Sequence, residues 1–448
     1  MKEKLFVISI DAMVREDVAY MLTKPNFARI MGKRAEVEQV CSVYPALTYP
    51  AHATLATGCN PGKHGILHNQ PPIPFGDKVS HWYLYSRDMK VENIFAAAKR
   101  AGCTTASVYW PTTGCDTNID HNIDEYFFYY PDETIEQGFA RLGADKAALK
   151  AVRENLHRYP TTIRSGKIDL ASTFDNFAIG CTCSLIRNNQ PDVMLVHVCP
   201  VDSARHRYGT FANEVYDAMD QMDLWLGEIV DAMEAAGVYE DTNFVILSDH
   251  GQRDIKRFIN LNVLLEQGGF IDLGWDGSVY NWKAYAKTNG MSAGIYLQDY
   301  TDEKIYWKVY DYLKELAADP DHGIEAIHTA DDVRQRYGVY GTVAFVVEAD
   351  DDTAFGVACK GPVTKWIKDE ENPSYRAKHG YQPEKGPQPI FMGHGPAFRD
   401  GAVIASAQLM DVAPTLAAVL GQEMPQAEGR PLKELLTQTN YFYSGKQK

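Results

Sequence analysis

The stretch "LFVISID", residues 5–11, decides the fold of this chain. It is a short apolar run, rich in β-branched residues, that ends on Asp11. Such runs are typical of strands that are buried on both faces of a sheet. Comparable runs occur at residues 105–109, 193–199 and 244–247. We therefore expect these four segments to be strands of one central sheet.

Helical patterns lie between these strands. The clearest covers residues 211–236, where apolar side chains form one stripe at intervals of three or four residues: Val215, Met219, Met222, Leu226, Ile229 and Met233. We expect these methionines to pack in the core and not to bind a ligand. A second helix is expected at residues 91–101. Strands that alternate with helices predict an α/β fold with three layers, α/β/α, and a largely parallel central sheet.

Two insertions are expected in this core. Between residues 265 and 373, "MSAGIYLQDY" predicts a strand, "DEKIYWKVYDYLKELAA" a helix and "GTVAFVVEADDD" another strand. We interpret 265–373 as an inserted α+β cap subdomain, which leaves 1–264 and 374–448 as the core. The second insertion, about 120–167, opens with "EYFFYYPDE" and continues as polar helices.

The composition is that of a soluble globular protein, with 448 residues, 45% hydrophobic and 23% charged. A formal net charge of -15 argues against binding of nucleic-acid polymers, which depends on basic side chains. No apolar stretch approaches the roughly 20 residues that a membrane span needs. The N-terminal residues "MKEKLFVISIDAM" lack the features of a secretory signal. We therefore expect a cytoplasmic protein without a membrane segment, and the sequence does not indicate its oligomeric state.

Eight cysteines without a close-set framework fit reduced thiols. Cys181 and Cys183 form a CxC pattern in an expected helix. The alternative for this pair is a metal or redox role. Because free cysteine usually behaves as a small buried hydrophobe, we favour core packing for both side chains.

Three aspartates follow expected strands. Asp11 ends the first, Asp202 follows "DVMLVHVCPV", and Asp249 follows "NFVIL" with one serine between. A single such aspartate is more often only a turn former or a helix cap. However, ligands of parallel α/β sheets bind outside the carboxyl ends of the strands, so all three are expected at one edge. His206 and His250 accompany the last two, and carboxylate with imidazole is the ligand set of zinc and related divalent ions.

The stretch "CSVYPALTYPAHATLATGCNPGKHGILHN", residues 41–69, contains a helix start. Thr48 is expected to be the N-cap, and Pro50 suits the first helical turn because it lacks an N–H group. The stretch carries more polar side chains than a cap requires, namely His52, His64, His68 and Asn69.

Several motifs together resemble one known family. "SIDAM", the stretch 41–69, "VYWPTTG", "VDSARHRYG", "SDHGQ", "KHGY" and "GHGPAF" look like the successive motifs of type I phosphodiesterases and nucleotide pyrophosphatases, within the alkaline phosphatase superfamily. The resemblance implies an alkaline phosphatase-like core. It also implies hydrolysis of phosphodiester or pyrophosphate bonds in a small, nucleotide-like substrate.

The resemblance also implies the residues of the site. A first zinc ion would be bound by Asp11, Asp249 and His250, next to the nucleophile Thr48, which would also contact the metal. A second would be bound by Asp202, His206 and His379. His394 competes for the last position, but a glycine and a tyrosine follow only His379, so His394 is expected nearby, behind the ligands. Asn69 would donate a hydrogen bond to a phosphoryl oxygen.

Metal coordination would lower the pKa of the Thr48 hydroxyl, which favours a covalent phosphothreonine intermediate. Because Asn69 is neutral, a singly charged diester or a pyrophosphate is favoured over a monoester dianion. Tyr49, Tyr109 and Trp110 look like the family's substrate-binding aromatic residues. Two alternatives stay open: a C–P bond hydrolase similar to phosphonoacetate hydrolases, and a non-catalytic protein that binds a phosphate ligand.

Overall fold

The computed structural model describes residues 3–75, 82–125, 133–160, 171–371 and 373–437. Its centre is a sheet of eight described strands, in the order β19 (Val403–Gln408), β2 (Ala35–Cys41), β18 (Phe391–His394), β6 (Thr242–Leu247), β1 (Lys4–Ile10), β5 (Val193–Val198), β3 (Thr105–Val108) and β4 (His121–Ile123). Every neighbouring pair is parallel except the two that involve β18. The largely parallel sheet and its four expected strands are confirmed.

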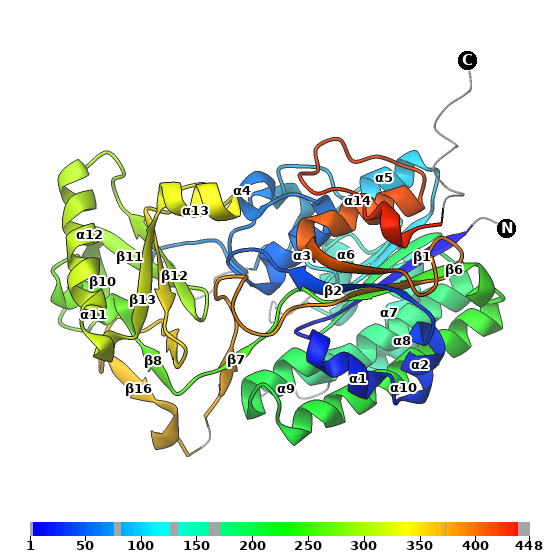
Figure 1. The fold of residues 1–448 in the computed structure, drawn as a ribbon, viewed down its shortest axis with the longest axis horizontal. Helices are drawn as coiled ribbons and strands as arrows, with labels where there is room; N and C mark the ends of the chain where they lie inside the picture. The colour runs from blue at the N-terminus through cyan, green and yellow to red at the C-terminus, as the bar shows by residue number, and fades with distance from the viewer. Residues whose placement is uncertain (1–2, 76–81, 126–132, 161–170, 372, 438–448) are drawn as a thin grey trace.

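Helices cover both faces of this sheet (Figure 1). Phe6, Ile8 and Ile10 of β1 belong to one hydrophobic cluster, whereas Leu5 and Val7 belong to another on the opposite face. The first cluster is shared with α1 (Val18–Met21), α2 (Pro25–Met31), α6 (Ile135–Arg141), α7 (Lys146–Asn155), α8 (Ala171–Asn189), α9 (Pro200–Tyr208) and α10 (Asn213–Ala236). The second is shared with α3 (Thr48–Thr57), α5 (Ile94–Arg100) and α14 (Val412–Val419). The three-layer prediction is confirmed.

Helix α10 buries the stripe that its sequence predicts. All six stripe residues are at most 3% exposed.

Cys181 and Cys183 of α8 lie in the same hydrophobic cluster as this stripe, at 0% and 2% exposure. The prediction that this CxC pattern packs in the core is therefore confirmed.

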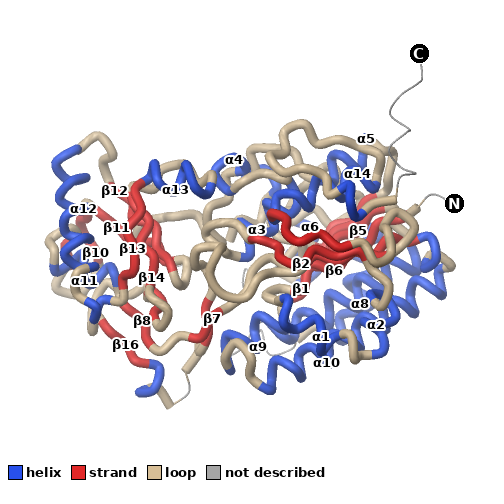
Figure 2. Tube along the Cα trace, in the orientation of Figure 1, coloured by secondary structure: helices blue, strands red, loops and turns tan. Residues whose placement is uncertain are grey.

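A second body of strands lies beside the core (Figure 2). An antiparallel sheet has the order β11 (Ala284–Thr288), β12 (Ser292–Leu297), β14 (Phe345–Ala349) and β13 (Ile324–Thr329). With it lie α11 (Leu261–Gln267), α12 (Glu303–Ala317), α13 (Ala330–Tyr337), the pair β9 (Ile271–Leu273) and β10 (Val279–Trp282), and the sheet β15 (Thr353–Phe355), β8 (Arg257–Ile259) and β16 (Thr364–Trp366). The strands and helix expected in the cap are present.

The hydrophobic cluster of this cap is wider than the expected 265–373. It includes Ile255 and Ile259 before that range and Tyr381 after it. The physical reason is strand pairing, because β8 pairs with β15 and β16, which follow about 100 residues later. The division of the chain into core and cap remains our interpretation.

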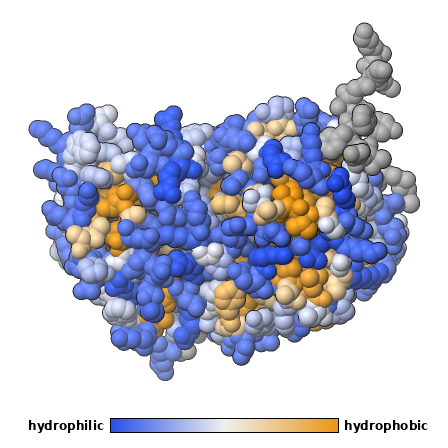
Figure 3. Space-filling view, in the orientation of Figure 1, coloured by the Kyte–Doolittle hydropathy of each residue, from blue (hydrophilic) through white to orange (hydrophobic). Residues whose placement is uncertain are grey.

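In the second insertion, α6 and α7 are present, and both pack on the main core through Phe139 and Val152. Most of the aromatic run "EYFFYYPDE" lies outside the described residues. Of the described helices, none is long and apolar enough to cross a membrane. Hydrophilic residues dominate the face in Figure 3, as the charged composition predicts.

His64 ends α4 (Pro61–His64) and has a structural role. Its side chain is fully buried, and its Nδ1 accepts a hydrogen bond from the backbone N–H of Ile66 at 3.1 Å. Burial lowers the pKa of His64 to about 3. In the unfolded chain the value is about 6.5. The folded protein therefore favours the neutral ring. The contribution of His64 to the free energy of unfolding is at its maximum above pH 6.5 and decreases as the pH falls toward 3.

We expect a His64→Gln protein to lose less stability than the wild type on acidification. Between pH 7 and pH 5, the free energy of unfolding of the wild type should fall by about 2 kcal/mol more than that of the variant. Urea unfolding of both metal-free proteins at the two pH values measures this difference. Equal losses would show that His64 is not neutral in the folded state.

Candidate metal centre and nucleophile

The three predicted aspartates lie at one edge of the central sheet. In the parallel ladders, Ile10 of β1 is level with Val198 of β5, and Ser9 is level with Leu247 of β6. The carboxyl ends of the three strands therefore coincide. Asp11 and Asp249 directly follow this edge, and Asp202 lies in the first turn of α9. The sequence expectation of a shared edge is confirmed.

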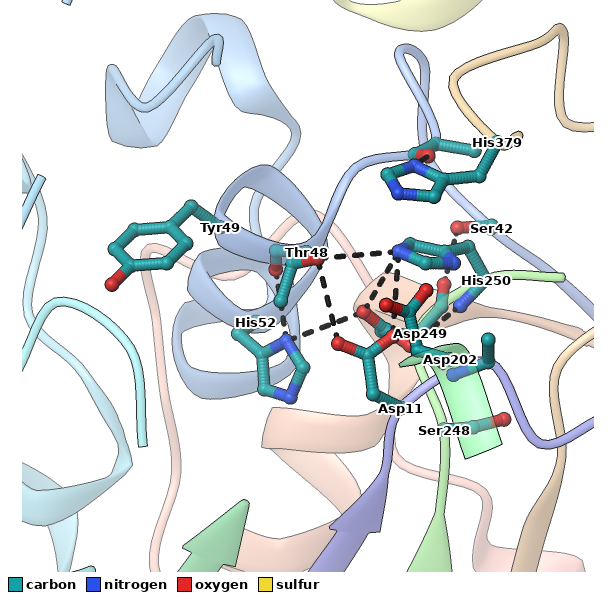
Figure 4. Close-up of polar contacts among 12 residues, drawn as sticks. Asp11, Ser42, Thr48, Tyr49, His52, Asp202, Ser248, Asp249, His250 and His379 are labelled. Atoms are coloured by element: carbon teal, nitrogen blue, oxygen red, sulfur yellow. Dashed lines mark hydrogen bonds and ion pairs between the residues drawn. The ribbon is translucent and has the colours of Figure 1, made fainter. Parts of the chain in front are cut away.

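Asp11, Asp249 and His250 could hold a metal ion and form the first candidate ligand group, with one donor atom from each within 4.8 Å of the others. His250 Nε2 lies 3.2 Å from Asp249 Oδ2 and 3.6 Å from Asp11 Oδ1. All three side chains are at most 3% exposed. Figure 4 shows the His250 ring beside Thr48 and the carboxylates of Asp11 and Asp249 below it.

Asp202, His206 and His379 form the second group. One turn of α9 separates the first two, and His206 Nε2 lies 3.5 Å from Asp202 Oδ2. His379 follows β17 (Ala377–Lys378), which pairs with β7 (Arg253–Asp254). The His379 ring stacks on the His250 ring, with ring centroids 4.0 Å apart, so the two groups are neighbours.

Both histidines of the second group are oriented for ligation. His206 Nδ1 lies 2.8 Å from the carbonyl oxygen of Ala377, and His379 Nδ1 lies 3.0 Å from that of Ala46. A carbonyl oxygen only accepts, so each Nδ1 must carry the proton. Each Nε2 then keeps its lone pair, as a neutral metal-binding imidazole does.

The electrostatics of the site fit residues that bind a divalent cation. Burial, followed by the charges of Asp249 and Asp202, raises the pKa of Asp11 well above its usual value. Burial lowers the pKa of His206 to about 4 and that of His379 well below its usual value. Among the described residues, the buried atoms Asp11 Oδ1 and Asp249 Oδ2 have no hydrogen-bond partner. Neutral imidazoles and carboxylate oxygens without donors fit divalent cations.

Thr48 is the first residue of α3, and Leu47 is the N-cap, with φ -126° and ψ 149°. The expected N-cap role of Thr48 was therefore wrong, whereas Pro50 does lie in the first turn. The Thr48 hydroxyl is thus free of a capping role, and it points at the first ligand group. Thr48 Oγ1 lies 3.5 Å from Asp11 Oδ2 and 3.3 Å from His250 Nε2.

Asn69 lies beside the same helix start. Its Oδ1 accepts a hydrogen bond from the backbone N–H of Tyr49 at 3.0 Å. This contact fixes the carboxamide one residue away from Thr48. Its Nδ2 donates to no group among the residues that the structure describes.

The three expected substrate-binding aromatics are buried. Tyr49 is 0% exposed, and its hydroxyl donates to Glu125 Oε2 at 2.7 Å. Tyr109 and Trp110 are 3% and 1% exposed, and Trp110 packs edge-on against His52. Tyr109 and Trp110 follow β3 and belong to the two hydrophobic clusters on either side of the sheet. A direct substrate contact stays a prediction for all three residues.

His394 does not lie behind the ligands. It pairs with Phe244 near the start of β6, because β18 runs antiparallel to that strand. Asp249 lies beyond the other end of β6, about 16 Å away at the rise of a strand. His394 instead contacts Asp400, with Nδ1 3.5 Å from Oδ1. Its expected place near the metal centre was wrong.

Sequence reasoning missed some residues that contact the ligands. His197 Nε2 lies 3.3 Å from Asp11 Oδ2, and Cys199 joins these two in a third cluster of potential ligands. Gln252 Nε2 donates to Asp202 Oδ1 at 2.5 Å. A histidine inside the apolar strand "VMLVHV" was an available signal for His197. The glutamine gave no comparable signal, because only the fold brings it to Asp202.

Known proteins resemble this chain over most of its length. The human ectonucleotide pyrophosphatase/phosphodiesterase family member 5 is 22% identical over 94% of this chain and 74% of its own. An uncharacterized pyrophosphatase/phosphodiesterase of Schizosaccharomyces pombe is 24% identical over 69% of this chain, which spans 54% of that protein. A bis(5'-adenosyl)-triphosphatase of Pongo abelii is 20% identical over 93% of this chain and 78% of its own.

Solved structures share the fold. The human ectonucleotide pyrophosphatase/phosphodiesterase 5 structure has a TM-score of 0.67 at 21% identity, covering 97% of this chain and all of that one. An inactive threonine-to-alanine variant of the murine protein, in complex with AMP, has a TM-score of 0.66 at 19% identity over the same shares. The family model described as "Type I phosphodiesterase / nucleotide pyrophosphatase" matches residues 5–382. The chain therefore belongs to the type I phosphodiesterase and nucleotide pyrophosphatase family.

Proposed function

We propose that this protein is a metal-dependent hydrolase of phosphodiester or pyrophosphate bonds in small, nucleotide-like substrates, with Thr48 as the nucleophile. The observation that carries this proposal is the place of the Thr48 hydroxyl. It lies 3.5 Å from Asp11 Oδ2 and 3.3 Å from His250 Nε2, at one of two neighbouring ligand groups. A structural threonine would not need two metal-ligand side chains beside its hydroxyl.

The two ligand groups fit two divalent ions, and zinc matches their nitrogen and oxygen donors. When bound, such ions lower the pKa of a coordinated hydroxyl and offset the negative charge of a phosphoryl group. The ligands include three carboxylates, Asp11, Asp202 and Asp249. Two divalent ions would therefore leave the site net cationic in a chain of charge -15.

Thr48 would carry the reaction in two steps. Its Oγ1 loses the proton and bonds to phosphorus, while the bond from phosphorus to the leaving oxygen breaks and that oxygen takes up a proton. Water then breaks the bond between Thr48 and phosphorus, which restores the hydroxyl and releases the product. Asn69 Nδ2 would donate to a non-bridging oxygen in both steps, because its Oδ1 is already held by Tyr49.

The relatives support a nucleotide-like substrate. One has the name bis(5'-adenosyl)-triphosphatase. A structural neighbour that is inactive through a threonine-to-alanine change was solved with AMP.

We retain the cytoplasmic location as a prediction. All eight cysteines are free thiols in the structure, as a reducing compartment would leave them. Binding of nucleic-acid polymers is not expected from the acidic composition.

A substrate comparison tests this proposal against its alternatives. We expect the zinc-loaded protein to hydrolyse the p-nitrophenyl diester of thymidine 5'-monophosphate at least about tenfold faster than p-nitrophenyl phosphate or phosphonoacetate. The measured quantity is kcat/KM for each compound. Preference for phosphonoacetate would favour the C–P bond hydrolase. Metal binding without turnover of any compound would favour the non-catalytic binding protein.

A further inference from the structure

His52 is a buried titratable residue that the proposed reaction does not use. It lies one turn after Thr48 in α3 and is 0% exposed. In Figure 4 its ring lies below Thr48, on the same side as Asp11 and Asp249. It is therefore placed between the nucleophile and two ligands without belonging to either ligand group.

The His52 ring has polar contacts on both of its nitrogens. Nδ1 lies 2.8 Å from the carbonyl oxygen of Thr48 and 3.5 Å from Asp249 Oδ2. Nε2 lies 2.9 Å from Ser9 Oγ. Ser9 is a residue of β1, two positions before Asp11. One ring thus connects the nucleophile's own backbone with the two strands that supply Asp11 and Asp249.

These contacts determine which nitrogen carries the proton. The Thr48 carbonyl oxygen can only accept a hydrogen bond. Nδ1 must therefore be the donor. Nε2 then has a lone pair and accepts from the Ser9 hydroxyl, which is able to donate. In this tautomer, one neutral ring makes both hydrogen bonds, to the Thr48 carbonyl oxygen and from the Ser9 hydroxyl.

The ring is also held by packing. Trp110 contacts it edge-on, with ring centroids 5.0 Å apart, and His197 lies at 4.2 Å. Both neighbours are at most 1% exposed. Rotation of the His52 ring would break the polar contacts and displace these side chains. This arrangement also gives Trp110 a supporting role that fits its burial.

We propose that His52 is a positioning residue, which holds the backbone of Thr48 at a fixed place relative to Asp11 and Asp249 through its Nδ1–H group. This inference rests on the proposed function, in which Thr48 is the nucleophile. A displacement of a reacting group by about 1 Å can cost about 100-fold in rate. Loss of the donor to the Thr48 carbonyl should thus lower kcat while substrate and metal still bind.

A matched pair of substitutions tests each nitrogen. In His52→Asn, the side-chain N–H group can occupy the place of Nδ1, so the contact with Thr48 is kept and the contact with Ser9 is lost. In His52→Gln, the amide reaches the place of Nε2, so the reverse holds. We expect kcat to fall less than about threefold in the asparagine variant and about 30-fold or more in the glutamine variant, with KM and zinc content unchanged in both.

The thermal midpoint separates positioning from a merely structural role. Each variant loses one buried hydrogen bond, so both should have similarly lowered midpoints although their kcat values differ. Equal losses of kcat in the two variants, or none in either, would overturn the inference. Ser9→Ala, which leaves Nδ1–H in place, should lower kcat less than about threefold; a loss as large as in His52→Gln would also overturn it.

The tautomer of the wild-type protein gives a measurement that does not depend on a folded variant. The ¹⁵N chemical shifts of His52 in the zinc-loaded protein should show a protonated Nδ1 and an unprotonated Nε2. A proton on Nε2 would overturn the inference. Thr48→Ala, assayed in parallel, distinguishes the two proposals. If that variant is active, Thr48 is not the nucleophile. If it is inactive and the two His52 variants lose the same amount of kcat, only the positioning role is refuted.

Discussion

A Thr48→Ala protein is expected to bind as much metal as the wild type and to lose about 1,000-fold or more of its kcat. The substitution removes a hydroxyl that lies beside Asp11 and His250. The six side chains of the two ligand groups stay in place. Because no bond to phosphorus can then form on the protein, the remaining rate is that of direct attack by water. Turnover of the thymidine diester and metal counting per chain measure both expectations.

Thr57 provides a matched control for this change. It lies in the same helix, α3, and is fully buried, but its hydroxyl donates to the carbonyl oxygen of Ala53 at 2.7 Å. Thr57→Ala should lower stability by about 1 kcal/mol and leave kcat near the wild-type value. Comparable rates in Thr48→Ala and the wild type would show that Thr48 is not the nucleophile.

The strands that the sequence predicted are those whose residues are buried on both faces. All residues of β5 and β6 are buried, so their apolar runs are continuous. In contrast, β19 lies at the edge of the sheet and has only one buried residue, and β18 has four residues in all. Such strands have little hydrophobic pattern. Their place depends on pairing with β2, which is far away in the sequence.

The site shows the same division between local and distant information. Asp11, Asp202 and Asp249 could be predicted to share an edge because each follows a strand of the same sheet. The place of His394 could not, since it depends on the antiparallel direction of β18. The exposure of Tyr109 and Trp110 was also beyond the sequence, because an aromatic motif at a strand end looks the same whether it faces substrate or core.

The contrast between His379 and His394 gives the second large expected effect. His379 belongs to the second ligand group with Asp202 and His206. His394 lies at the opposite end of β6 from Asp249. We expect His379→Ala to bind one metal ion per chain instead of two, and to lose about 100-fold or more of kcat. His394→Ala should keep both ions and a kcat near that of the wild type.

Loss of the His379 ring also removes the stacking on His250 at 4.0 Å, which belongs to the first ligand group. His379→Phe separates the two effects, because phenylalanine can stack but has no nitrogen to bind a metal. If ligation is the cause, the phenylalanine and alanine variants should lose the same ion and similar activity. A phenylalanine variant that keeps two ions and its rate would show that His379 supports His250 and is not a ligand, and the second site would then rest on Asp202 and His206 alone.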